Sequence, residues 1–249
     1  MTSATTTART PTQPQHSYQQ PPAITVTETE PVVTVRDPRT PHNFGPVSLV
    51  RDKTVFTAER PGHYQQDFQS TRIIDDWIHH MQQQGIHHVV IIMDDNEFDV
   101  YRQHEIDLID FYRTAGLIVH HIPFNTTTTT TPPLSCTSTC KTTTCSTTAT
   151  PGVAASSTTP SPSSSSSSSS YHDLMDLIHT LDAQGHKVVV HCSGGKGRCG
   201  RVACAWLCHR WCLSPRAASQ EFIDAACAHG LYRLGDVQKL KQWIGYSSC

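Results

Sequence analysis

The stretch KVVVHCSGGKGRCGRVACAW, residues 187–206, places a nucleophilic side chain, glycines and an arginine within a few positions of one another. An apolar run leads into Cys192, and Arg198 follows six residues later. Glycines occupy positions 194, 195 and 197 between them. Glycine permits positive φ angles and lets the backbone approach a ligand closely. The spacing therefore predicts a loop whose backbone binds a ligand beside a reactive sulfur.

Phosphate is the ligand that this loop suits. Successive N–H groups of the loop and of a helix that starts near Arg198 can converge on one anion, while the guanidinium matches two phosphate oxygens. The same positive field should lower the pKa of the Cys192 thiol below the ~8.5 of a free cysteine. We expect phosphoryl transfer to Cys192 and then hydrolysis of the cysteinyl phosphate, with no metal or cofactor required. The phosphate-binding residues would be Ser193, Gly194, Gly195, Lys196, Gly197 and Arg198.

Two other readings of the loop are open. The first is a structural glycine-rich turn with a buried cysteine. The second is a nucleotide-binding loop, but its Gly-x4-Gly-Lys-Ser/Thr pattern is absent because Gly197 and Arg198 follow Lys196. A strand, a cysteine, glycines, an arginine and a helix in this order favour the phosphoryl-transfer reading.

Strands and helices alternate around this loop. Ser70 is the expected N-cap of the first helix, and Ser214 and Pro215 open another. Alternating elements predict an α/β layered fold with a largely parallel sheet, whose functional loops lie at the carboxyl ends of the strands. The expected strands cover residues 47–50, 54–59, 86–93, 117–122 and 187–190, and the expected helices cover 70–85, 104–116, 171–185, 200–212, a segment from 214, and 235–245.

Two segments lack the pattern of a folded core. Residues 1–45 are rich in Thr, Pro and Gln, and we expect a disordered tail there. Residues 126–170 contain a run of eight serines and no Asp or Glu, which predicts a low-complexity insertion within a domain that spans 46–249. Deleting residues 127–169 should leave the fold intact.

Composition narrows the possible partners and compartment. The formal net charge is −2, so no global basic field points to nucleic acid. No apolar run approaches the ~20 residues of a membrane span. The first residues have no apolar core of the kind that a secretory signal needs. Ten cysteines are therefore expected as reduced thiols in the cytoplasm or nucleus.

The segment HCSGGKGR, residues 191–198, resembles the His-Cys-x-x-Gly-x-x-Arg signature of cysteine-dependent protein tyrosine and dual-specificity phosphatases. Residues 101–102, 116–123 and 194–207 are similar to the kinase-associated type of this family. The resemblance implies a four- or five-stranded sheet flanked by helices and a phosphoprotein substrate, with a cyclin-dependent kinase as one such partner. It also implies Cys192 as nucleophile and Arg198 as phosphate clamp.

The sequence departs from the family where a general-acid aspartate is expected. The family places this aspartate after the strand that ends here in HHIP, but Thr126 stands near its position. No carboxylate occurs between Asp110 and Asp173. Asp173 is a candidate for a displaced acid, and an ordinary residue at a helix start is the alternative. Asp94, Asp95 and Asp99 are further candidates after another strand.

Three residues of the loop region have open roles. Cys199 stands where the family usually has Ser or Thr. Its thiol could donate to Cys192 more weakly than a hydroxyl, or it could form a reversible disulfide with Cys192. The third reading is that the difference has no effect. Lys196 could favour a phosphoinositide, or it could be a solvated lysine. His191 is expected to brace the loop rather than to act as a base.

The leading hypothesis is a phosphatase for phosphotyrosine, and also for phosphoserine or phosphothreonine, that works through a cysteinyl phosphate. A phosphoinositide or RNA 5′-phosphatase is the enzymatic alternative. A phosphate-binding adaptor with slow or absent turnover is the non-enzymatic alternative, because a general acid is missing and Cys199 is unusual.

Overall fold

The protein is an α/β sandwich, described by a computed structural model over residues 24–64, 71–124 and 171–246. Its main sheet has five strands in the order β2-β3-β6-β4-β5. β2 is antiparallel to β3, and the other neighbouring strands are parallel. The five-stranded, largely parallel sheet with flanking helices confirms the predicted fold class. The strands are β2 (Gly45–Pro46), β3 (Val55–Glu59), β4 (His88–Ile91), β5 (Ile118–His121) and β6 (Val188–Cys192).

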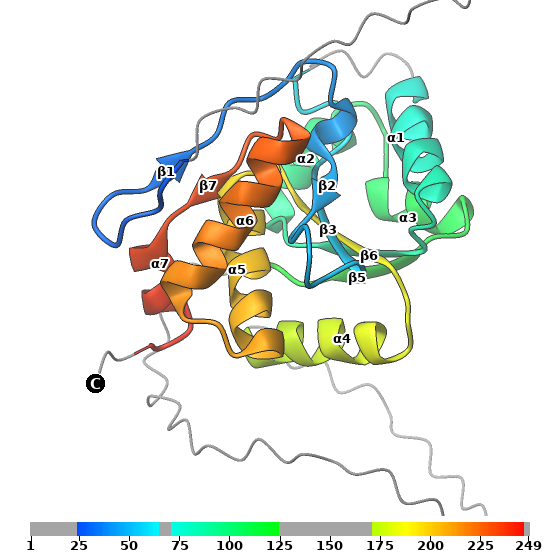
Figure 1. Ribbon diagram of the computed structural model, residues 1–249. Helices are drawn as coiled ribbons and strands as arrows, with labels where there is room; N and C mark the ends of the chain where they lie inside the picture. Colours follow the sequence, from blue (N-terminus) through cyan, green and yellow to red (C-terminus); the bar gives the residue numbers. More distant parts are fainter. Residues whose placement is uncertain (1–23, 65–70, 125–170, 247–249) are drawn as a thin grey trace, which may run out of the picture.

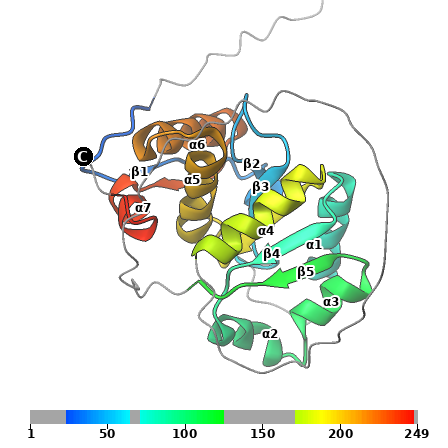
Figure 2. The same ribbon diagram turned by 90° about the horizontal axis from the view of Figure 1, so that it is seen from below.

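Helices cover both faces of this sheet (Figures 1 and 2). One face carries α1 (Arg72–Gln83), α2 (Asp99–Arg102) and α3 (Leu108–Thr114). The other carries α4 (Tyr171–Ala183), α5 (Gly197–Trp211) and α6 (Pro215–His229), with α7 (Val237–Trp243) beside them. Two 3-10 turns, Pro41–Asn43 and Asp95–Phe98, complete these helical elements.

The valines of β6 show how the sheet divides the core. Val188 and Val190 belong to the hydrophobic cluster that contains Trp206 of α5, whereas Val189 belongs to the cluster that contains Trp77 of α1. Side chains alternate between the faces of a strand, so a continuous apolar run suits a strand that is covered on both sides. The loop that follows β6 therefore starts from a strand that is packed on both faces.

Most predicted elements are present, with shifted boundaries. The helix predicted at 104–116 begins only at Leu108, because the Asp107 side chain accepts hydrogen bonds from the backbone N–H groups of Ile109 and Asp110. α1 begins after Thr71, and the predicted cap Ser70 lies outside the described residues. Ser214 does cap α6, since its Oγ accepts from Ala217 N at 3.3 Å.

The strand predicted at 47–50 was wrong. The Ser48 hydroxyl accepts from the backbone N–H groups of Val50 and Arg51, which bends the chain into a turn. Short polar side chains compete in this way with strand ladders. β2 instead lies just before this turn, at Gly45–Pro46.

The prediction of a tail over residues 1–45 was wrong for residues 24–45, which we call the N-terminal strap. Val26 is fully buried against Ile223 and Val237. β1 (Val32–Val33) pairs antiparallel with β7 (Leu234–Gly235). A few apolar residues and backbone pairing thus order a segment whose average composition is polar. Residues 1–23 of the predicted tail and the predicted insertion at 126–170 lie outside the described residues.

Candidate active site

The predicted phosphate loop lies at the carboxyl edge of the sheet, between β6 and α5. Cys192 is the last residue of β6 and is 3% exposed. Arg198 lies in the first turn of α5, which starts at Gly197. Gly195 has φ +64°, and a Cβ there would lie 2.6 Å from backbone atoms of Ala58 and Glu59. Only glycine therefore lets the loop lie directly against the end of β3.

The Cys192 sulfur lies beside a second thiol. Cys199 Sγ lies 3.4 Å from Cys192 Sγ and donates to it. This hydrogen bond lowers the pKa of Cys192 to about 6; burial opposes the shift, while the Arg198 charge and the N–H groups of Cys199 and Gly195 support it. Burial and the neighbouring sulfur raise the pKa of Cys199 well above its usual range. Cys192 is thus the thiolate of the pair, and Cys199 remains its protonated donor.

Arg198 is held by Glu97, a residue that the sequence analysis did not select. Both guanidinium Nη atoms donate to the Glu97 carboxylate, and Nη1 also donates to Ile92 O at 3.2 Å. The two side chains are 19% and 23% exposed. Although burial opposes it, the hydrogen bond from Arg198 holds the pKa of Glu97 below its usual value. The pair is therefore fully ionised at neutral pH.

Glu97 is placed by a capping arrangement after β4. Asp94 N donates to Glu97 Oε2 at 2.9 Å, and the Asp94 side chain accepts from the backbone N–H of Glu97. The Asp-x-x-Glu spacing is visible in the sequence as a helix-start signal. This spacing is a signal for Glu97, whereas the candidate acids predicted from the sequence were its neighbours Asp94, Asp95 and Asp99.

His191 and Lys196 both contact aromatic side chains. His191 is fully buried, lies edge-on to Trp77 and has its Nε2 3.4 Å from Tyr112 Oη. Burial lowers its pKa to about 3, so the imidazole is neutral at physiological pH. Lys196 Nζ donates to Tyr232 Oη at 2.8 Å and lies over the Tyr232 ring.

The candidate acid Asp173 lies in the first turn of α4 and is exposed. Its neighbour Tyr171 contacts the Trp243 ring of α7 with centroids 5.1 Å apart. Thr126, which stands near the family's acid position, lies outside the described residues.

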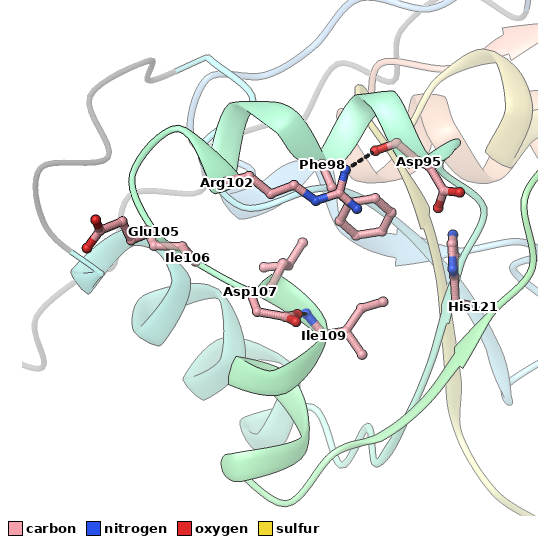
Figure 3. Close-up of a pocket in the computed structure, with 9 residues that line it drawn as sticks. Asp95, Phe98, Arg102, Glu105, Ile106, Asp107, Ile109 and His121 are labelled. Atoms are coloured by element: carbon pink, nitrogen blue, oxygen red, sulfur yellow. Dashed lines mark hydrogen bonds between the residues drawn. The ribbon is translucent and has the colours of Figure 1, made fainter.

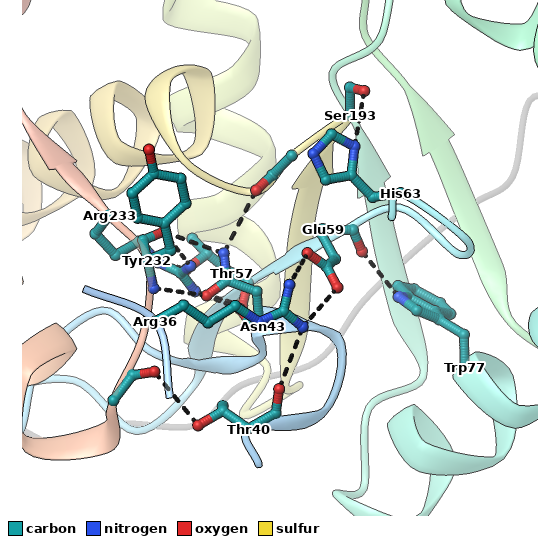
Figure 4. Close-up of polar contacts among 12 residues, drawn as sticks. Arg36, Thr40, Asn43, Thr57, Glu59, His63, Trp77, Ser193, Tyr232 and Arg233 are labelled. Carbon is teal, nitrogen blue, oxygen red and sulfur yellow. Dashed lines mark hydrogen bonds and ion pairs between the residues drawn. The ribbon is translucent and has the colours of Figure 1, made fainter. Parts of the chain in front are cut away.

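The loop after β3 borders the phosphate loop on one side, and the sequence analysis did not find it. Arg60 Nε donates to Ser193 Oγ at 3.1 Å, and Arg60 N donates to the carbonyls of Cys192 and Ser193. His63 Nδ1 lies 3.4 Å from Ser193 Oγ (Figure 4). A Cβ at Gly194 would come within 2.9 Å of the His63 ring, so a larger residue there would require this side chain to move.

The N-terminal strap supports the loop from behind (Figure 4). Asn43 Nδ2 donates to Tyr232 O at 3.1 Å and to Gly194 O at 3.4 Å. Arg233 is fully buried and donates to Asn43 O, Thr57 O and Thr57 Oγ1. Burial lowers the pKa of Arg233 to about 10, while the nearby cysteines favour its charge. These contacts join residues 151 to 190 positions apart, so no local sequence pattern predicts them.

A separate pocket of about 330 Å³ opens beside the site (Figure 3). It is lined by residues of the turn after β4, of α2 and α3, and by His121. Arg102 Nη1 donates across its rim to Asp95 O at 2.8 Å. No residue from 191 to 199 lines this pocket, so it is distinct from the predicted phosphate loop.

Residues 127–239 match a family model described as Swiss Army Knife protein, DSP-PTPase phosphatase domain. The matched range includes the loop from Cys192 to Arg198. No curated protein matches the chain. No helix in the described ranges is long and apolar enough to cross a membrane.

Several solved structures are similar in fold. A kinase associated phosphatase with its catalytic-site cysteine replaced by serine has a TM-score of 0.50 and 17% identity, covering 84% of this chain and 99% of that chain. Tk-PTP in the active form has a TM-score of 0.45 and 20% identity, covering 81% and 99%. PTPMT1 in complex with PI(5)P has a TM-score of 0.43 and 15% identity, covering 81% and 94%.

Proposed function

We propose that this chain, whose phosphatase domain belongs to the cysteine-dependent dual-specificity and protein tyrosine phosphatase superfamily, hydrolyses phosphotyrosine in proteins. The observation that carries the proposal is the position of the Cys192 thiol, at the end of β6, 3.4 Å from the donor Cys199 Sγ and just before Arg198 in the first turn of α5, an arrangement that lowers its pKa to about 6. A buried thiolate with a guanidinium beside it suits nucleophilic attack on phosphorus. Phosphoserine and phosphothreonine would be further substrates of the same site.

The reaction would take place in two displacements. The Cys192 thiolate attacks phosphorus, the S–P bond forms, and the P–O bond to the leaving group breaks. The N–H groups of residues 193–197 and Arg198 stabilise the charge on the transferred oxygens. Water then attacks the phosphorus of the cysteinyl phosphate, which returns the Cys192 thiolate and releases inorganic phosphate. No step requires a metal or a cofactor.

Glu97 would orient the Arg198 guanidinium, which is proposed to bind the phosphate. It holds both Nη atoms of Arg198, so the guanidinium is oriented before substrate arrives. A bidentate pair fixes the plane of the guanidinium as well as its position. Glu97 is therefore proposed as a positioning residue.

The leaving group is the reason for favouring phosphotyrosine. The sequence has no carboxylate between Asp110 and Asp173, so no Asp or Glu stands where the family places its general acid. Loss of a general acid typically costs on the order of 10²–10⁴ in rate. The cost is smaller for a phenolate, which leaves without protonation more readily than an alkoxide. Asp173 remains the proposed donor for substrates that need one.

Phosphate release from p-nitrophenyl phosphate and from a phosphotyrosine peptide tests the proposal. Cys192→Ser should abolish turnover of both. Asp173→Asn should slow the peptide if Asp173 protonates the leaving oxygen, and Asp176→Asn, on the same helix and also exposed, is the matched control. Turnover that survives in Cys192→Ser, or a folded wild type that binds phosphopeptide without releasing phosphate, would contradict the proposal, and the second result would indicate an adaptor.

The loop and the cysteines also bear on the substrate class and the location. Lys196 donates to the hydroxyl of Tyr232, a neutral partner that does not cancel an ammonium charge, so a phosphoinositide or an RNA 5′-phosphate stays the alternative substrate to compare in the same assay. Because residues 101–102, 116–123 and 194–207 resemble the kinase-associated type of phosphatase, we propose a cyclin-dependent kinase as the first phosphoprotein to test. Reduced cysteines suit the cytoplasm or nucleus, which we propose as the location.

A further inference from the structure

Arg201 lies one turn beyond Arg198 on α5. Residues three apart on a helix share a face, with Cβ atoms about 5–6 Å apart. The Arg201 guanidinium lies over the ring of Phe124, 4.7 Å from its centroid. Phe124 follows β5 at the carboxyl edge of the sheet and is 4% exposed. Arg201 therefore lies one helical turn from Arg198 and against the residue that follows β5.

Arg201 has no anionic partner within the described ranges. It forms no hydrogen bond or ion pair there, whereas the partly buried Arg36 and Arg198 each pair with a carboxylate. Burial lowers its pKa, and Asp236 is the carboxylate that most favours its charge. The Asp236 side chain is itself bound to the backbone N and the Nζ of Lys239.

A half-buried cation without a partner points to a missing anion. Burial of a charge costs free energy unless the charge is paired. The ring of Phe124 offsets part of that cost, because a guanidinium over an aromatic face is stabilised. The charge of Cys192 also acts on Arg201, which places the guanidinium within electrostatic reach of the reacting sulfur.

We propose that Arg201 binds a second anionic group of the substrate, a carboxylate of an acidic residue next to the phosphotyrosine. The inference rests on the proposed function and specifies its substrate. The phosphate occupies the loop on Arg198, and the flanking carboxylate reaches the neighbouring guanidinium on the same helix face. A planar guanidinium with five N–H donors suits a carboxylate, and Phe124 holds that plane in place.

Two phosphotyrosine peptides that differ only in Glu or Gln residues flanking the phosphotyrosine test this inference. Wild type should favour the Glu peptide by about tenfold in kcat/KM, the size expected of one charge-assisted hydrogen bond. Arg201→Gln should abolish the preference, and Arg201→Lys should restore part of it. The ratio is the readout because a change in folding or in the Cys192 thiolate affects both peptides alike. Arg216→Gln, an exposed arginine in the first turn of α6, should keep the preference.

The same ratio is measured as affinity in the Cys192→Ser variant, by fluorescence anisotropy of the two labelled peptides. This binding measurement separates the two proposals. A chain that binds the peptides without turnover would contradict the proposed function, but its relative affinity for the two peptides would still test the role of Arg201. Equal treatment of the two peptides by wild type would overturn the inference. So would a preference that persists in Arg201→Gln. If the wild type preferred a peptide with a second phosphate but not the Glu peptide, a carboxylate would also be rejected as the group that Arg201 binds.

Discussion

At the scale of single residues, two neighbouring sulfurs lie where β6 ends and α5 begins. Cys192 and Cys199 are seven positions apart in sequence, and their Sγ atoms lie 3.4 Å apart. Cys199 Sγ also lies near the carbonyls of Ala58 and Val190, so it is fixed among buried acceptors. The Cys199 thiol acts as a donor to Cys192 Sγ.

Removal of this donor should raise the pKa of Cys192. With the hydrogen bond present, the pKa is about 6 and the thiolate dominates above that pH. Cys199→Ala should move the midpoint of iodoacetamide inactivation against pH to higher values, whereas Cys199→Ser keeps a donor and should stay near wild type. A midpoint that is unchanged in Cys199→Ala would show that Arg198 and the backbone N–H groups suffice.

The same proximity predicts protection against oxidation. Hydrogen peroxide oxidises the Cys192 thiolate to a sulfenic acid, and attack by Cys199 sulfur forms the S–S bond and expels water. Activity lost to peroxide should therefore return with dithiothreitol in wild type. In Cys199→Ala the loss should become irreversible as oxidation continues, which mass spectrometry of the peptide containing Cys192 would show. Equal recovery in both proteins would exclude the disulfide.

At the scale of elements, the turn after β4 and the N-terminal strap hold the loop that β6 and α5 present. Glu97 in the Asp95–Phe98 turn binds Arg198, and Asn43 of the strap binds Gly194 O. Neither element has a sequence pattern that marks it as part of an active site. The supporting residues are nevertheless as well buried as the loop itself.

Glu97→Gln should lower kcat/KM by about tenfold or more, because a charge-assisted bidentate contact is lost and Arg198 is no longer oriented. Arg198→Lys should show a loss that is not additive with Glu97→Gln, since both changes break the same pair. Phosphate release from p-nitrophenyl phosphate by the two single variants and the double variant measures this. Glu105→Gln is a control at an exposed carboxylate near α3. Additive losses would mean that Glu97 acts elsewhere.

The sequence was informative where interactions are local. The valines of β6, the Ser214 cap and the glycines before Arg198 could be read directly, because each depends on neighbours a few positions away. The Glu97–Arg198 pair joins residues 101 positions apart, so composition and spacing do not reveal it. The strap was misread because its few buried apolar residues are diluted by Thr and Pro, while their partners lie near the other end of the chain.

At the scale of the whole molecule, burial of neutral histidines links stability to pH. His191 lies in the central strand, and His42 of the strap lies against the ring of His80 in α1. Mainly through burial, the pKa of His191 falls to about 3 and that of His42 to about 4. Both must be uncharged in the native protein at neutral pH.

The free energy of unfolding should therefore fall as the pH falls below about 6.5, the pKa of histidine in an unfolded chain. Between pH about 6.5 and 4 the unfolded chain binds protons at these histidines and the native chain does not, so acid favours unfolding. Each such histidine lowers the free energy of unfolding by at most ~1.4 kcal/mol per pH unit. Urea unfolding at several pH values over this range measures the slope. His42→Asn should make it shallower, and asparagine tolerates the positive φ of 54° at this position. His229→Asn, at the exposed end of α6, should leave the slope unchanged, and an equal slope in His42→Asn would show that His42 is not buried as a neutral group.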